Sequence, residues 1–190
     1  MEHLRPGPGK SEHIPIVYRA ELHRVRYQAR VGGIYAVDIG VDLAAVALER
    51  YGEAKSIYED FLEPTDSRLG GLYNNMALAC VSLKEYDRAR ELYQKAIEVM
   101  SALPGGKPET AITYLNLANA AEAQQGLENA DGFISDCLQT AEELLLDGSN
   151  AQDGNYAFVC EKCAPTFEYY GWFMTAEELK RRSDGIYERT

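Results

Sequence analysis

Apolar residues recur three and four positions apart along the chain from Ile14 onward, in segments separated by short polar breaks. This is the spacing of one buried face of an amphipathic helix, and it predicts an all-α fold. The breaks contain proline, glycine and helix-capping residues. The longer breaks are at 64–67, 104–108 and 147–150, and the tighter turns are at Tyr51–Gly52, Lys84–Glu85, Gln125–Gly126 and Tyr170–Gly171. Thr175 with Glu178 three residues later predicts a capping box at the last helix.

The helical segments repeat along the chain. Tyr51, Ala54 and Tyr58 recur 35 residues later as Tyr86, Ala89 and Tyr93. A second set, Tyr73, Met76, Ala77 and Cys80, recurs 41 residues later as Tyr114, Leu117, Ala118 and Ala121, and a weaker copy runs from Cys160 to Ala176. Small residues such as Ala89 and Ala130 opposite large ones let two helices approach closely. Each pair then needs a neighbour to cover its apolar face, which predicts a right-handed α-solenoid with a concave inner face.

The stretch LYNNMALACVSLKEYDRARELYQKAIEV resembles a whole tetratricopeptide repeat, and TYLNLANAAEAQQGLENADGFISDCLQTA resembles a second. The 41-residue step is similar to the long repeats of kinesin light chains and of bacterial peptide-sensing regulators. The resemblance implies three to four antiparallel helix pairs, at about 35–66, 67–103, 108–147 and 152–188. Asp38 and Asp42 depart from the pattern in the first copy, and Pro165 is expected to interrupt a helix in the last.

The ends of the chain are expected to differ from the repeats. Residues 1–13, rich in proline, glycine and charge, predict a disordered tail. Residues 14–31 predict an additional helix within a single domain that spans 14–190.

The charge and the apolar pattern of the chain argue against two classes of partner. The net charge is −11, made of +3 over residues 1–33 and −14 over the rest. An acidic body argues against nucleic acid, because phosphate binding needs a basic face. The chain has no apolar run of the roughly 18 residues that a membrane span requires, and its first residues lack the apolar core of a secretory signal. These features predict a cytoplasmic protein that binds neither nucleic acid nor membrane.

Reactive chemistry has weak support in the sequence. Cys160 and Cys163 form a CxxC motif, which is compatible with a redox or zinc switch. Both cysteines, however, occupy slots that hold Tyr73 and Met76 in one repeat and Tyr114 and Leu117 in the next, which favours buried thiols in the core. The three histidines lie at 3, 13 and 23, without metal-ligand spacing and outside the repeats. We therefore expect no enzyme activity, no cofactor and no metal.

Asparagines are the best candidates for a binding site, because a side-chain amide both donates and accepts hydrogen bonds. Asn74, Asn75, Asn116 and Asn119 lie on the first helices of two consecutive repeats. The family resemblance implies that Asn75 and Asn116 line the inner groove and hold a peptide backbone, with Asn119 one turn further along. Completing the predicted wall are Leu78, Ser82 and Ala123. The alternative is that these amides bond neighbouring helices or water.

The predicted groove is poor in basic residues. The chaperone-tail clamp of this family uses lysine and arginine on the inner face, and here only Lys162 falls in such a slot. The expected partner is therefore a neutral or basic protein or peptide segment, extended or helical. A second hypothesis is a scaffold that self-associates through an end face as a homo-oligomer, with its groove empty or filled by its own tail.

Overall fold

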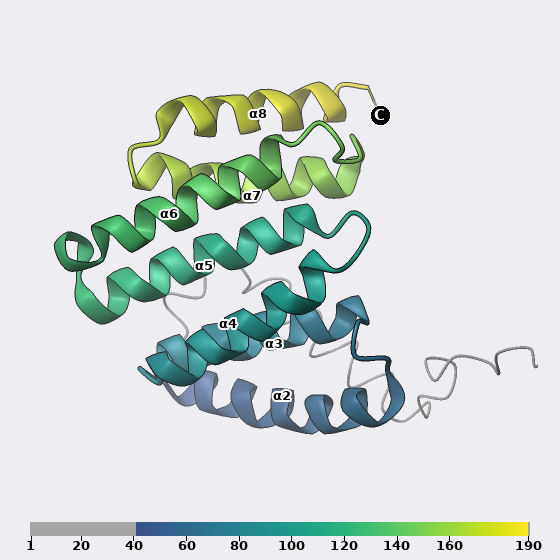
Figure 1. The fold of residues 1–190 in the computed structure, drawn as a ribbon, viewed down its shortest axis with the longest axis vertical. Helices are drawn as coiled ribbons and strands as arrows, with labels where there is room; N and C mark the ends of the chain where they lie inside the picture. The colour runs from purple at the N-terminus through teal and green to yellow at the C-terminus, as the bar shows by residue number, and fades with distance from the viewer. Residues whose placement is uncertain (1–40, 190) are drawn as a thin grey trace, which may run out of the picture.

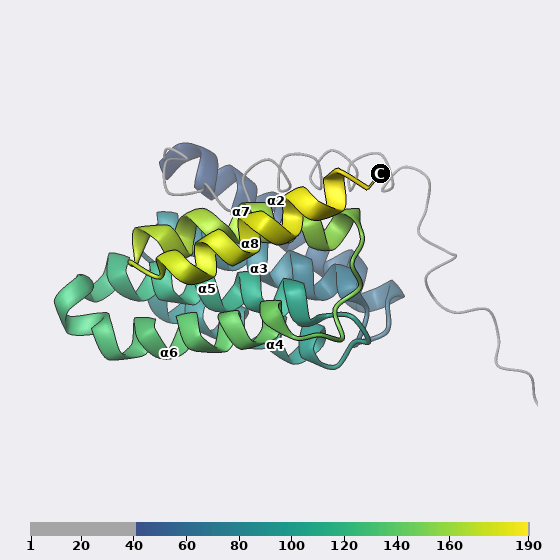
Figure 2. The ribbon, with the colours of Figure 1, turned by 90° about the horizontal axis from the view of Figure 1, so that it is seen from above.

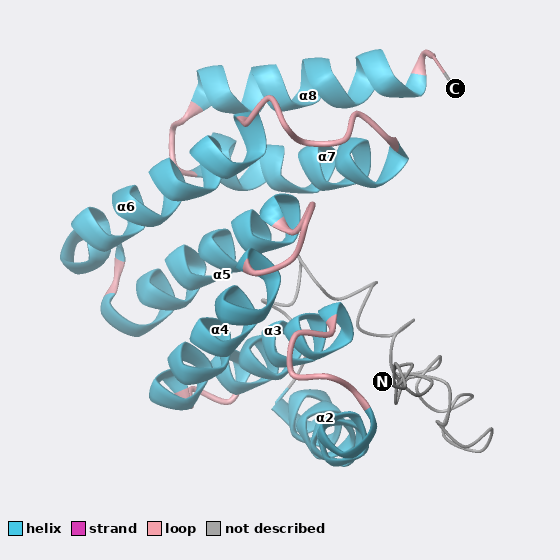
Figure 3. Ribbon diagram, turned by 45° about the vertical axis from the view of Figure 1, so that its right-hand side comes forward, coloured by secondary structure: helices cyan, strands magenta, loops and turns pink. Residues whose placement is uncertain are grey.

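The computed structural model describes residues 41–189, with side chains from residue 43. Over this range the secondary structure is helical, with loops between the helices (Figure 3). The helices are α2 (Val41–Phe61), α3 (Ser67–Ser82), α4 (Tyr86–Ser101), α5 (Lys107–Gln125), α6 (Leu127–Leu146), α7 (Gly154–Tyr169) and α8 (Phe173–Tyr187). The predicted tail at 1–13 and the predicted helix at 14–31 lie outside the described residues.

Three antiparallel helix pairs stack on one another: α3 with α4, α5 with α6, and α7 with α8. Helix α2 packs on α3, and the short turns within the pairs all lie on one edge of the stack, with the longer loops on the other (Figure 1). The first helices of the pairs, α3, α5 and α7, contact one another, whereas α4 and α6 lie on the far side (Figure 2). The all-α solenoid predicted from the repeat pattern is confirmed.

The helix ends follow local backbone chemistry. The side chain of Asp66 caps α3 by accepting a hydrogen bond from the backbone N–H of Arg68 at 3.0 Å. Each short turn contains one residue in the left-handed region: Lys84 (φ 61°), Gly126 (φ 80°) and Gly171 (φ 81°). Glycine adopts this conformation without steric cost, so two of the three turns are unstrained.

The core confirms the small-against-large pattern. Ala89 is fully buried and Ala130 is 2% exposed. A similar close approach occurs at Gly70, where an added Cβ would lie 2.8 Å from Cγ of Met100. Four tyrosines of the predicted core stripe are buried (Tyr51, Tyr58, Tyr73 and Tyr93), but Tyr86 and Tyr114 remain partly exposed. The prediction of a wholly buried stripe is therefore wrong at those two positions.

Three local predictions are corrected by the structure. The turn expected at Tyr51–Gly52 within residues 35–66 is absent, because both residues lie inside α2. Helix α7 runs through Pro165, which is exposed; a proline removes one backbone hydrogen bond, and the packing on both sides of the helix tolerates that loss.

The capping box predicted at the start of the last helix is also wrong. Helix α8 begins at Phe173, so Thr175 lies inside its first turn. The Thr175 hydroxyl is buried and donates a hydrogen bond to Glu142 of α6. Tertiary contact with the preceding pair therefore replaces the local cap.

One buried polar atom in this core leads to a prediction about stability. Tyr93 is fully buried, and its hydroxyl has no hydrogen-bond partner. Because an unpaired buried hydroxyl costs about 1–3 kcal/mol, Tyr93→Phe should leave the free energy of unfolding unchanged or raise it by up to about 1.5 kcal/mol. Urea denaturation followed by circular dichroism measures this change.

Tyr156→Phe is the matched control. The hydroxyl of Tyr156 donates to the backbone oxygen of Leu145 at 2.7 Å and accepts from Arg182 at 2.9 Å. Its removal should lower the free energy of unfolding by about 1–3 kcal/mol. A loss of stability in Tyr93→Phe as large as that in Tyr156→Phe would contradict the reasoning.

Candidate functional site

The inner face of the stack, defined here as the exposed surface of α3, α5 and α7, contains most of the predicted binding residues. Asn116 of α5 is only 3% exposed, and its Nδ2 donates to Oδ1 of Asn74 on α3 at 3.0 Å. This pair links two neighbouring repeats, as the alternative interpretation of the asparagines expected. Asn75 is partly exposed and forms no hydrogen bond with any described residue.

A cluster of polar groups joins α5 to α7 further along the inner face. The Tyr170 hydroxyl lies 3.0 Å from Oδ1 of Asn119 and 2.7 Å from Oε2 of Glu122. The Tyr169 hydroxyl donates to Oε1 of Glu122 at 2.7 Å. Burial, followed by the neighbouring Glu122, raises the pKa of Tyr170, so this hydroxyl keeps its proton for the hydrogen bond.

Sequence reasoning missed Glu122 and the two tyrosines. Glu122 lies three residues after Asn119, on the same helix face, and this spacing was the available signal. Its tyrosine partners are 47 and 48 residues further along the chain, so only the stacking of α7 on α5 brings them together.

The remaining predicted residues make other contacts. Leu78 is half-buried against the core, and the Ser82 hydroxyl donates to the backbone oxygen of Leu78 at 3.2 Å. Ala123 is exposed, and its backbone oxygen accepts a hydrogen bond from the Tyr86 hydroxyl at 3.1 Å. The ammonium of Lys162 is 3.7 Å from Oε1 of Glu161 and 5.5 Å from the ring centre of Phe158.

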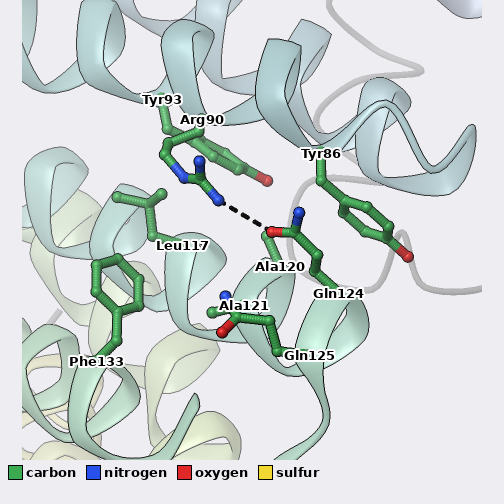
Figure 4. Close-up of a pocket in the computed structure, with 9 residues that line it drawn as sticks. All are labelled: Tyr86, Arg90, Tyr93, Leu117, Ala120, Ala121, Gln124, Gln125 and Phe133. Atoms are coloured by element: carbon green, nitrogen blue, oxygen red, sulfur yellow. Dashed lines mark hydrogen bonds between the residues drawn. The ribbon is translucent and has the colours of Figure 1, made fainter. Parts of the chain in front are cut away.

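A cavity of about 230 Å³ lies among α4, α5 and α6, and it was not predicted from the sequence. Leu117, Ala120 and Ala121 lie between the aromatic rings of Tyr86 and Phe133 (Figure 4). The rim is polar: Arg90 donates to Oε1 of Gln124 at 3.0 Å, and Gln125 lies beside it. Residues of three helices form this cavity, so no single segment of sequence predicts it.

Comparison with known proteins matches part of the chain to a family. The family model described as tetratricopeptide repeat matches residues 68–143. This segment of the chain consists of tetratricopeptide repeats. A crystal structure of nearly identical TPR-like repeats of a putative kinesin light chain from Podosopora anserina resembles it with a TM-score of 0.50 and 14% identity. The match covers 95% of this chain and 81% of that one, and at this identity it shows the fold alone. No curated protein matches the chain.

The cysteines lie in the core of the stacked helix pairs. Cys80, Cys137, Cys160 and Cys163 are each at most 3% exposed. Burial raises the pKa of Cys80 to about 11 and that of Cys137 to about 12. It raises the pKa of Cys160 and Cys163 as well. Thiols that stay protonated and covered are poor nucleophiles and poor metal ligands.

Within 41–189, no group of three histidine, cysteine or acidic side chains is placed to hold a metal ion. No helix in that range is long and apolar enough to cross a membrane. The predicted cytoplasmic location and the lack of nucleic-acid binding stay predictions.

The link between repeats can be tested with a double-mutant cycle. Asn74→Ala and Asn116→Ala should each lower the free energy of unfolding by about 1–2 kcal/mol, with a coupling of about 0.5–1.5 kcal/mol. Asn75→Ala is the matched control, since its amide bonds no described residue, and it should change stability by less than about 0.5 kcal/mol. Additive effects of Asn74→Ala and Asn116→Ala, measured by urea denaturation, would rule the link out.

The buried thiols predict slow chemistry. At pH 8 the native protein should not react with a disulfide reagent such as Ellman's over an hour, because the reactive thiolate is neither formed nor reachable. In 6 M guanidinium all four thiols should react within minutes. Fast reaction of Cys160 and Cys163 in the native protein, lost in the Cys160→Ala and Cys163→Ala variants, would instead support a redox switch.

Proposed function

We propose that this chain is a protein-interaction module that binds a neutral or basic polypeptide segment along its inner face. Tetratricopeptide repeats generally mediate protein–protein interactions, and proteins built from them are typically scaffolds rather than enzymes. The observation that carries the proposal is the environment of the Glu122 carboxylate. Its carboxylate is fixed by two tyrosine hydroxyls on the inner face, and no lysine or arginine among the described residues pairs with it.

The surroundings of Glu122 favour a cationic side chain. Two of the roughly four lone-pair sites of the carboxylate accept the tyrosine hydroxyls, which leaves the others for an ammonium or guanidinium group. The Tyr169 ring is 68% exposed and stacks edge-on against Tyr170 with ring centres 4.9 Å apart. A cation that pairs with the carboxylate can also rest on an exposed aromatic ring.

The charges of α7 also favour a neutral or basic partner. Glu161 and Glu168 lie on this helix with Lys162, its one basic residue. Glu168 pairs with Lys180 of α8 at 2.9 Å, so that carboxylate is partly neutralised. Glu161 accepts a hydrogen bond from Tyr187 of α8 at 3.2 Å, so the unpaired carboxylate among the described residues of the inner face is that of Glu122. An acidic segment would meet Glu122 at close range, and this repulsion is costly wherever water is excluded.

We assign the contacts with the partner's backbone to Asn75 rather than to the Asn74–Asn116 pair. Asn116 is buried and engaged with Asn74, so it offers a partner little surface. Asn75 is partly exposed, with its amide uncommitted to described residues, and can accept and donate to a peptide unit. Leu78, Ser82 and Ala123 supply the wall beside it, and Asn119 contributes by orienting Tyr170.

Peptides selected on the immobilised protein test the proposal. Display of random peptides should enrich lysine and arginine over aspartate and glutamate among the binders. Ala123→Trp should then weaken the selected peptides at least tenfold, about 1.4 kcal/mol, because the ring occupies the inner face. Fluorescence polarisation with labelled peptides gives the dissociation constants.

Ala102→Trp is the matched control, because Ala102 is also an exposed alanine but lies at the end of α4, away from the inner face. It should leave peptide affinity unchanged. Equal loss in both variants, or selection of acidic peptides, would contradict the proposal. Glu122→Gln should weaken the basic peptides while leaving neutral ones unaffected.

A further inference from the structure

The exposed apolar side chains are concentrated on one edge of the stack. Six of the nine large apolar residues that are exposed among the described ones lie in the first two turns of α2, α6 or α8. They are Leu43 and Val46, Leu127 and Phe133, and Phe173 and Met174. These helices all begin at the edge that holds the short turns (Figure 1). We call this surface the turn edge.

Helix α4 also begins at the turn edge but presents no such side chain. In its place, Tyr86, Arg90 and Tyr93 form one wall of the 230 Å³ cavity described above. A cavity of about 150 Å³ accommodates a benzene molecule, so this one has room for a single phenylalanine or methionine side chain. The turn edge therefore has protruding apolar groups at α8, where Phe173 is 65% and Met174 is 80% exposed, and an apolar hollow at α4.

Charge along the turn edge has the same asymmetry. Residues 84–90, around the start of α4, contain three cations (Lys84, Arg88 and Arg90) and two anions, a net charge of +1. Arg88 pairs with Glu85 at 2.9 Å and Arg90 with Asp87 at 3.3 Å, within the same segment. The first two turns of α6 contain only anions, Glu128 and Asp131, and Glu177 follows the apolar pair of α8. One surface thus holds both halves of a complementary contact, in shape and in charge.

A two-fold symmetric contact requires this kind of surface, because the same patch must meet itself in reverse. We propose that the turn edge binds a second copy of this chain, with Met174 of each copy inserted into the α4–α5–α6 cavity of the other and Phe173 packed against the rim of that cavity. In this arrangement Arg88 and Arg90 of one copy face the acidic starts of α6 and α8 in its partner. This contact borders the proposed peptide site, because the hydroxyl of Tyr86, which lines the cavity, donates to the backbone oxygen of Ala123.

Sedimentation velocity on the full chain tests the proposal. Between about 1 and 200 µM, the wild type should shift from monomer to dimer, and the dissociation constant should rise with salt as the facing charges are screened. Met174→Asp should raise the dissociation constant at least tenfold. Ala120→Phe, which fills the cavity from within, should do the same. Phe158→Asp is the control, an exposed apolar residue off the turn edge that should have no effect.

Mixing the two variants distinguishes reciprocal insertion from any other contact. Met174→Asp keeps an intact cavity and Ala120→Phe keeps an intact protruding pair, so their mixture regains one of the two contacts. It should associate more tightly than either variant alone. Circular dichroism melting of each variant checks that the fold is retained, and Gln125→Trp replaces Ala120→Phe if that variant unfolds. A monomeric wild type, a dimer indifferent to Met174→Asp, or a mixture no tighter than its components would each overturn the proposal.

Discussion

The structure depends on the incomplete burial of each helix pair. Two antiparallel helices cover only part of their combined apolar surface, so every pair requires the next to bury the rest. Close approach is made possible by side chains with little or no bulk, such as Ala89, Ala130 and Gly70, against large partners. The contacts within a pair use one face of each helix, and the contacts between pairs use another. Further pairs can therefore be added only along the axis of the stack. Layers and edges follow from this single constraint.

Polar groups within the stack act mainly as connectors. Asn116 joins α5 to α3, Thr175 joins α8 to α6, and Tyr156 joins α7 to the end of α6. Each of these groups pairs with a residue of another repeat, and buried polar groups stabilise a fold only when so paired. Tyr93 is the exception, with a buried hydroxyl that has no partner. The cysteines are packing residues of the same interior, and their burial makes them unreactive rather than functional.

The surfaces left by stacking differ in chemistry. The inner face of α3, α5 and α7 is polar and acidic around Glu122, which suits a basic or neutral segment. The turn edge is apolar at α8 and hollow at α4, which suits a surface that protrudes where this one is hollow. The two surfaces adjoin where α5 and α7 end, because Tyr169 and Tyr170, which hold Glu122, directly precede the short turn into α8. A dimer through the turn edge would present two inner faces, and a partner with two basic segments would then gain from effective concentration.

The sequence alone determined the helices, the repeat and most of the buried positions, since apolar spacing within one segment records which face is covered. It misplaced features that depend on neighbours: Tyr51–Gly52 lies inside α2, Thr175 bonds α6 instead of capping its own helix, and α7 continues through Pro165. It identified Asn116 as a polar residue of the repeat, but only the tertiary structure decided that its amide is used by Asn74. The Glu122 cluster and the α4–α5–α6 cavity are likewise tertiary, because their members are brought together by stacking and come from segments up to 51 residues apart.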